Sequence, residues 1–403
     1  MRSEAFPRLS RGFTLVEIMV GVLIGLIGTV VIFQVFAVSE GQKRTTTGAS
    51  DAQQNGVFGL FQIERDVRMA GYGMNNMALL GCKINGWYEP GGAKIEFKMV
   101  PVEIINGVGG APDRVRLAFG NSDLFMAPAK FVANANNSQA NYKIDNKFGF
   151  NEGDLVVAAQ AGKSCTLAQI HNVNPSNYEI GHGSGNYTNP EGAQVPTQFN
   201  KPGGLPAPEG TGYDKWDQVA NTGARLYNLG AAPTVVTYAI QGSTLVASNG
   251  LMPGMPDQTA VLSDGVVQLQ AQYGYDGDAV ADGFVASTAT YNAEVNLASN
   301  QDQWADSMPA VATGVHWQRV IAVRLVVTAR SITPERPDPV SGLCTATTVQ
   351  PRWIAPAPTA VPPGIEIDVK STFADANEWM CYRYRTFEVV VPIRNMLWYP
   401  LNA

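Results

Sequence analysis

Positive charge is missing from a long stretch near the start of the chain. There is no Lys or Arg between Arg11 and Lys43, and residues 13–36 form an almost unbroken apolar run. As a helix with a rise of about 1.5 Å per residue, this run is roughly 36 Å long, enough to cross a bilayer with some tilt. Its one full charge is Glu17. A carboxylate in hydrocarbon is costly, so it marks a functional residue whose partner must be found.

Histidine is also scarce, which weakens any enzymatic interpretation. The three histidines are His171, His182 and His316, and none has a Cys, Asp or Glu at a metal-ligand spacing. Residues 181–185 (GHGSG) lack the glycine that a nucleophile elbow needs two positions before its serine. The sequence has no phosphate-binding glycine-rich loop with Lys and Ser or Thr. We therefore expect no enzyme.

Charged residues and cysteines are both few in this chain. Charged residues make up 15% of the chain and the net charge is −6, so no basic field favours nucleic acid. The 41 glycines and 25 prolines predict many turns between short strands. All four cysteines follow the apolar run, and they allow three pairings. Sequence order favours disulfides Cys82–Cys165 and Cys344–Cys381.

The start of the apolar run suggests a partner for its acid. A cut after Gly12 would leave the new amino group of Phe13 one helical turn from Glu17. The preceding residues carry three arginines against one acid, which keeps them cytoplasmic and sends the rest of the chain outward.

Residues 12–17 (GFTLVE) resemble the class III leader of type IV pilins. The resemblance implies that a prepilin peptidase cleaves after Gly12 and that the amine of Phe13 is then methylated. In a filament, this amine of one subunit would meet Glu17 of the next. Two other interpretations remain. One is a secretory signal cut near Ala37, which would need a shorter apolar core. The other is a plain membrane anchor, which leaves the Gly-Phe junction and Glu17 unexplained.

The helix is predicted to continue beyond the membrane. Leu60, Ile63 and Val67 recur at helical spacing, and Gly71 offers a C-cap, so one helix is expected over about residues 13–70. Gly48 and Gly56 each weaken it by about 1 kcal/mol relative to Ala, which makes a local break plausible.

The rest of the chain reads as short strands separated by loops. Strands are predicted at residues 115–119, 154–159, 165–173, 234–240, 266–275, 317–330 and 384–393. Residues 174–232 read as a long surface loop, either functional or disordered. The expected fold class is α+β, with a long N-terminal helix packed on a β-rich, loop-rich, pilin-like head. The expected segments are a leader (1–12), a transmembrane half-helix (13–36), an amphipathic half-helix (37–70) and the head (71–403).

Two further motifs resemble the PilW-type minor pilins: residues 63–73 (IERDVRMAGYG) and a final strand that ends in Arg394-Asn395. The charged residues of the first motif, Glu64 to Arg68, are expected to form a solvated helix face. The resemblance implies a minor pilin of the pilus tip or initiation complex. Its partners would be prepilin peptidase, other minor pilins, the major pilin and the inner membrane. The head would lie in the periplasm and then on the surface pilus.

One acidic turn is a weak candidate metal site. Asp276, Asp278 and Asp282 are closely spaced oxygen ligands after a predicted strand, as Ca²⁺ requires. The acid expected at the twelfth loop position is Ser287 instead, so an ordinary acidic β-turn is favoured and no other cofactor is expected.

Two alternative functions stay open. A minor pseudopilin of a type II secretion system would share the leader and the fold. A pilus-borne adhesin would bind its ligand through residues 174–232. A role in cell adhesion or twitching motility would follow if the chain is a pilus protein, either as a minor pilin or as an adhesin.

Overall fold

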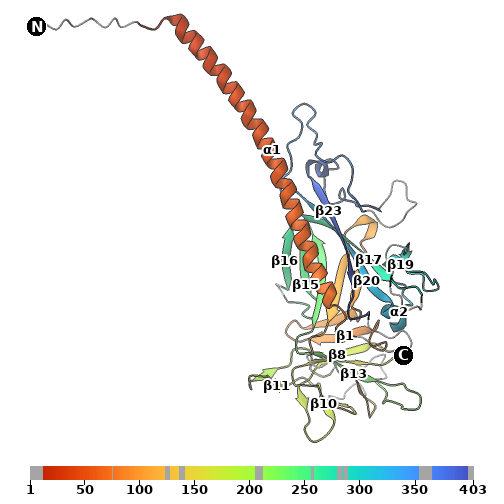
Figure 1. Cartoon of the computed structure of the whole chain (residues 1–403). Coiled ribbons are helices and arrows are strands. Elements are labelled where there is room, and N and C mark those ends of the chain that lie inside the picture. The colour runs from red at the N-terminus through yellow and green to blue at the C-terminus, as the bar shows by residue number, and fades with distance from the viewer. Residues whose placement is uncertain are drawn as a thin grey trace, which may run out of the picture.

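The longest element is an unbroken helix. The computed structural model describes residues 12–74, 76–122, 128–135, 141–204, 212–255, 258–278, 284, 289–353 and 365–397. Helix α1 spans Leu15–Met69, 55 residues, or roughly 82 Å by its rise. Its first half projects freely and its second half lies against a β-rich head (Figure 1). The α+β fold class is therefore confirmed.

The glycines of α1 do not break the helix, so the expected break is wrong. A Cβ atom added to Gly56 would lie 2.3 Å from Cε2 of Phe387, and one added to Gly48 would lie 2.9 Å from Cβ of Ser331. Both glycines are buried. They serve close approach between helix and head, and this packing outweighs their low helix propensity.

Two five-stranded sheets hold the second half of α1. One has the order β18-β19-β17-β20-β23 and the other β16-β15-β14-β4-β3. In the first sheet, β20 pairs antiparallel with β17 and with β23, for example Leu325 with Ala271 and with Val389. The strands of the first sheet are β17 (Val266–Tyr275), β18 (Thr290–Glu294), β19 (Gln303–Ser307), β20 (Val320–Arg330) and β23 (Tyr384–Pro392). Those of the second are β3 (Val102–Ile105), β4 (Arg114–Phe119), β14 (Thr234–Gln241), β15 (Thr244–Asn249) and β16 (Thr259–Asp264).

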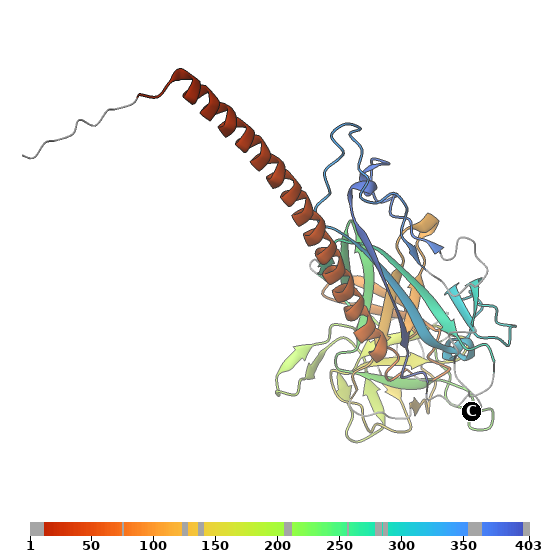
Figure 2. The same cartoon turned by 45° about the horizontal axis from the view of Figure 1, so that its top comes forward.

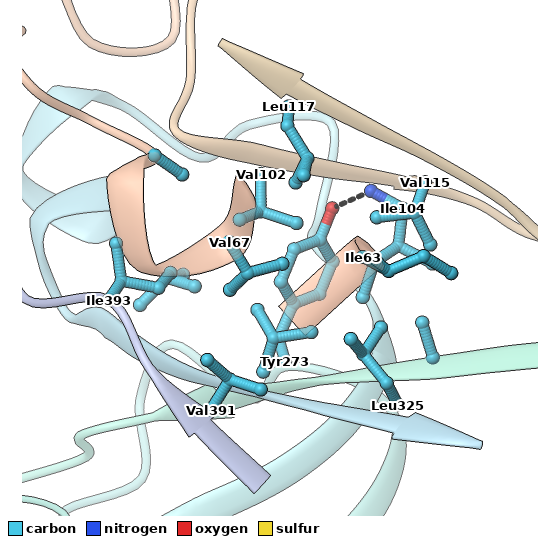
Figure 3. Packing of buried hydrophobic residues seen from close by; sticks show 14 of the residues in the cluster. Ile63, Val67, Val102, Ile104, Val115, Leu117, Tyr273, Leu325, Val391 and Ile393 are labelled. Atoms are coloured by element: carbon cyan, nitrogen blue, oxygen red, sulfur yellow. Dashed lines mark hydrogen bonds between the residues drawn. The ribbon is translucent and has the colours of Figure 1, made fainter. Parts of the chain in front are cut away.

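The main core lies where α1 meets these sheets. Ile63 and Val67 of α1 are fully buried, and they pack with Tyr273 and Leu325 of the first sheet (Figure 3). The hydroxyl of Tyr273 accepts a hydrogen bond of 2.5 Å from the backbone N–H of Ile104. This bond joins the two sheets beneath the helix and satisfies a polar group inside the core.

A third group of strands forms a distal lobe at the end of the head opposite the free half of α1 (Figures 1 and 2). Its main sheet has the order β2-β1-β8-β7-β13-β5, and smaller sheets are β6-β10-β9 and β11-β12. β1 and β8 are parallel, with Ile84 opposite Cys165. The strands are β1 (Lys83–Tyr88), β2 (Ala93–Lys98), β5 (Ala129–Lys130), β6 (Asn141–Lys143), β7 (Leu155–Ala159), β8 (Cys165–Gln169), β9 (Asn172–Val173), β10 (Glu179–Gly181), β11 (Asn186–Thr188), β12 (Gln194–Pro196) and β13 (Arg225–Gly230).

Residues 174–232 are therefore not a simple loop. The described part contains β10, β11, β12 and β13, and β13 lies inside the six-stranded sheet between β7 and β5. Most of these strands are short, and the Asn, Gly and Pro around them have low strand propensity, so there was little sign of them in the sequence.

The remaining elements cover the first sheet. Helix α2 (Gly314–Gln318) precedes β20, so Trp317, expected in a strand, is helical. Residues 331–383, an insert between β20 and β23, carry β21 (Arg352–Trp353), β22 (Ile365–Glu366) and a 3₁₀ turn, Glu378–Cys381. Trp353 and Trp379 of this insert pack on Val267 and Val326, on the sheet face away from α1. A further 3₁₀ turn spans Val108–Gly110.

Candidate assembly site

The N-terminus of α1 is closed by a reciprocal cap. Thr14 is the N-cap, and its backbone N–H and hydroxyl each donate a 2.9 Å hydrogen bond to Oε2 of Glu17. In return, the backbone N–H of Glu17 donates to Oγ1 of Thr14 at 3.3 Å. This capping box satisfies orphan donors of the first turn and fixes the carboxylate at the start of the helix.

Glu17 therefore has local polar partners within the first turn, in addition to the predicted amine. The signal was in the sequence: Thr14 and Glu17 have the S/T-x-x-E spacing of a capping box. An ionised carboxylate has about four acceptor positions, so these bonds leave capacity for a further donor. Phe13 is 86% exposed, and the Gly12–Phe13 peptide bond lies in non-helical chain just before Thr14.

The first half of α1 leaves its apolar side chains uncovered. Every large apolar residue from Phe13 to Val38 is exposed, and α1 is the one helix of the described residues that is long and apolar enough to cross a membrane. Exposure of this extent requires a cover of lipid or of other apolar helices.

The second half also keeps an exposed apolar strip. Val57, Phe58 and Phe61 are about half exposed. With Leu262 and Ile332 they line a groove of about 840 Å³ beside β16. This groove is a second exposed apolar surface on α1, separated from the apolar run by the mainly polar residues 39–56.

The C-terminal end of α1 is held by the far end of the chain. The side-chain amide of Asn395 donates hydrogen bonds to the carbonyl oxygens of Met69, at 3.1 Å, and Ala70, at 3.0 Å. Gly71 follows with a positive φ of 81°, and its N–H donates to the carbonyl of Ala118. The Arg394-Asn395 motif thus has a structural role, because it satisfies carbonyl groups that a helix end leaves free.

The charged run at residues 64–68 is only partly a solvated face. Arg68 bonds Glu64 within the helix, with Nε to Oε1 at 3.1 Å, as expected. Asp66, however, is largely buried and accepts a 2.6 Å bond from the hydroxyl of Tyr238 on β14. Burial, together with this bond, raises the pKa of Tyr238 above its ordinary value. Asp66 therefore links α1 to the second sheet.

Both disulfides that sequence order favours are present. Cys82 is bonded to Cys165, which links the residue before β1 to the start of β8. Cys344 is bonded to Cys381 and closes the insert between β20 and β23. Neither bond touches the cap at Thr14 and Glu17, so the cysteines stabilise the head rather than form part of the assembly site.

The acidic turn after β17 is described only in part. Asp276 is buried, and the carbonyl of Asp278 accepts a hydrogen bond from Nη2 of Arg319; Asp282 lies outside the described residues. Within the described ranges, no group of three or more His, Cys, Asp or Glu side chains is placed to hold a metal ion. Calcium binding stays a prediction.

Two family models match the chain. The model for the prokaryotic N-terminal methylation motif matches residues 7–33, around the capped start of α1. The model described as Type IV Pilus-assembly protein W (PilW) matches residues 234–395, from β14 to the Asn395 that caps α1. Over these two ranges the chain is similar to PilW-type type IV pilins. No curated protein and no solved structure matches it.

The two matched ranges leave the middle of this PilW-like chain uncovered. They cover the apolar half of α1, the first sheet and part of the second. Residues 34–233, which include the distal lobe, fall between them. The matches imply processing by a prepilin peptidase and contact with pilus components, as a membrane-anchored assembly protein requires.

Proposed function

We propose that this chain is a minor pilin, cut after Gly12 and methylated on the amine of Phe13, that enters the tip or initiation complex of a type IV pilus. The observation that carries the proposal is the capped start of α1. A carboxylate fixed by Thr14 lies one turn from the bond to be cut, at the head of a helix whose apolar sides are uncovered.

The geometry supports a division of tasks between the two halves of α1. Hydrolysis of the Gly12–Phe13 bond would create a cationic amine next to Thr14. In an apolar environment this amine needs an acid, and Glu17 of a neighbouring subunit, already oriented by its own capping box, can accept from it. The pair would set the axial register between adjacent helices, while the amphipathic half holds the head.

The tip position is proposed from the shape of the head. The distal lobe extends the head beyond the end of α1 (Figure 2). A head of this length would be hard to stack repeatedly along a thin filament, whereas the end of a filament leaves the distal lobe unobstructed.

The test is mass spectrometry of sheared surface filaments from the native host. We expect a peptide that begins with methylated Phe13. The Glu17→Val variant should be cleaved normally but be depleted from filaments, because the amine of its neighbour loses its acid. Glu40→Val is the matched control, because Glu40 lies further along α1, beyond the apolar run. Normal incorporation of Glu17→Val, or equal depletion of both variants, would contradict the role of Glu17.

The alternative system, a type II secretion pseudopilus, is distinguished by a deletion strain. Loss of surface pili and of twitching with normal protein secretion supports the pilus. Loss of secretion with normal pili would assign the chain to the pseudopilus instead.

A further inference from the structure

A cationic pocket lies at the boundary between the distal lobe and α2. Its volume is about 960 Å³, within the size range of small-molecule sites, about 300–1,000 Å³. The walls come from the segment after α1, the turn between β7 and β8, the loop before β13 and the first turn of α2. These elements lie at the end of the head away from the free half of α1 (Figure 1).

The charges of the pocket oppose those of the whole chain. Its charged lining residues are Lys83, Lys163 and Arg225, and no Asp or Glu is found among the described residues that line it, although the chain carries a net charge of −6. Lys163 is partly neutralised by Asp214 at 2.9 Å. Lys83 is mostly exposed, and its Nζ lies 3.7 Å from Oε1 of Glu96, a longer ion pair than that of Lys163. A site with this balance attracts an anion.

Arg225 and Lys130 share an aromatic partner rather than an acid. The guanidinium of Arg225 lies 4.3 Å, and Nζ of Lys130 5.0 Å, from the ring centroid of Trp216. The two cations are opposite each other on β13 and β5, so they lie on one face of the sheet. Among the described residues, neither has a carboxylate within salt-bridge distance. Arg225, which lines the pocket, therefore offers its positive charge to a ligand, whereas Lys130 lies outside the lining.

Trp216 is held in place before any ligand arrives. Its backbone N–H donates a 2.7 Å bond to the carbonyl of Phe131. The turn that follows is pinned by the carboxylate of Asp217, which accepts from the N–H groups of Val219 and Ala220. Asn221 in the same turn has a positive φ of 54°, the one such non-glycine residue in the described ranges. A fixed aromatic ring costs little conformational entropy on binding.

We propose that this pocket binds an acidic saccharide. A carboxylate of the sugar would pair with Arg225 and Lys83, and the apolar face of a sugar ring would lie against Trp216 and the apolar lining at Met77 and Val315. A peptide is less well suited, because the lining comes mainly from turns and loops and offers no free strand edge for β-augmentation. The membrane that anchors α1 is at the opposite end of the molecule.

The binding test uses the full chain purified in detergent and isothermal titration calorimetry. The acidic probes are tetragalacturonate, 3′-sialyllactose and a heparin-derived tetrasaccharide, and the neutral probe is cellotetraose. We expect at least one acidic probe to bind and cellotetraose not to bind. Arg225→Gln should weaken binding about tenfold, the loss expected for one charge-assisted hydrogen bond.

Two further variants make the test specific. Lys83→Gln should also weaken binding, and its exposed side chain makes it a safe substitute if Arg225→Gln fails to fold. Arg385→Gln, which removes an exposed cation on β23, should change the affinity less than twofold. The proposal is overturned if no acidic probe binds more tightly than about 1 mM, if cellotetraose binds equally well, if Arg385→Gln has the same effect as Arg225→Gln, or if an oligoglutamate peptide binds better than every sugar. Because binding is measured on the isolated chain, its failure would leave the assembly proposal untouched.

Discussion

At the scale of single residues, glycine and histidine have roles that composition alone does not indicate. Gly56 is a contact point rather than a weak point of α1, and Gly41, on the free part of the same helix, has nothing within 4 Å of an added Cβ. Replacement by Ala should therefore lower the free energy of unfolding at Gly56 but not at Gly41.

Gly56→Ala should destabilise the chain by about 1–3 kcal/mol, because overpacking against Phe387 exceeds the gain of about 1 kcal/mol in helix propensity. Gly41→Ala should be neutral or slightly stabilising. Denaturation of the purified chain, followed by tryptophan fluorescence, measures both. A Gly56→Ala variant as stable as Gly41→Ala would show that helix and head do not approach as closely as described.

His182 should make the distal lobe sensitive to acid. Burial lowers its pKa to about 4, with a smaller effect of nearby His171, and its ring stacks on Tyr142 at 3.8 Å. The unfolded state, with a pKa near 6.5, binds more protons between these values, so the free energy of unfolding falls as the pH drops from about 6.5 to 4. The loss is at most about 3 kcal/mol.

His182→Gln should flatten this pH dependence without removing the contributions of other groups. Urea denaturation at a series of pH values, for the wild type and the variant, gives the difference directly. Parallel curves for the two proteins between pH 4 and 6.5 would contradict the assignment to His182.

At the scale of elements, the insert between β20 and β23 is a separately closed unit on the outer face of the first sheet. Its disulfide joins residues separated by 37 positions in sequence, and loop-closure entropy predicts a contribution of about 4 kcal/mol. Its aromatic residues, Trp353 and Trp379, pack over Val326.

Replacement of Cys344 and Cys381 by Ser should loosen this insert and leave the distal lobe folded. Trypsin should then cut faster after Arg352 and Lys370 than in the wild type. The matched control replaces Cys82 and Cys165, whose bond lies in the distal lobe, and should leave the cleavage rate at these two sites unchanged. Equal acceleration in both variants would mean that the head unfolds as one unit.

Periodicity alone predicted the elements that have strong local patterns. The helix expected over residues 13–70 is α1, Leu15–Met69, and the strand expected over 266–275 is β17. The strand expected over 317–330 begins only at Val320. Trp317 belongs to helix α2 instead, and its side chain packs into the main core. The signal lies in the local sequence in each case: β17 alternates, the second half of α1 has helical spacing, and β20 and the first half of α1 are nearly continuous apolar runs.

The pairings could not be read from the sequence, because they join distant segments. β14 pairs with β4, and β1 runs parallel to β8; neither follows from the order of strands along the chain. The assembly residues Gly12, Phe13 and Glu17 were predicted from a short motif, and the cut after Gly12 and the role of Glu17 stay predictions. The pocket around Trp216 and Arg225 has no comparable motif, since long-range packing brings its walls together.

At the scale of the whole molecule, the two ends of the head differ in their relation to the family matches. The PilW family match covers the side of the head that holds α1, whereas the distal lobe lies outside both matched ranges. This division agrees with a common anchoring unit to which a further lobe is attached.

The proposed tip position makes a prediction about whole filaments. Immunogold labelling with an antibody against the distal lobe should mark filament ends, because the lobe points away from the anchored end of α1 (Figure 1). A filament that lacks the protein is the control for antibody specificity. Gold particles spaced regularly along the shaft would contradict the tip position.

The contact between Asn395 and the end of α1 also sets an order of events during biogenesis. It joins positions 325 residues apart, and β23 just before it supplies part of the surface on which α1 rests. Under the proposed membrane topology, α1 would enter the bilayer early, but its docking surface would be complete only after nearly the whole head had been translocated. During that interval the apolar face of α1 would be exposed to non-native contacts, so with the proposed topology we expect the chain to need periplasmic chaperones.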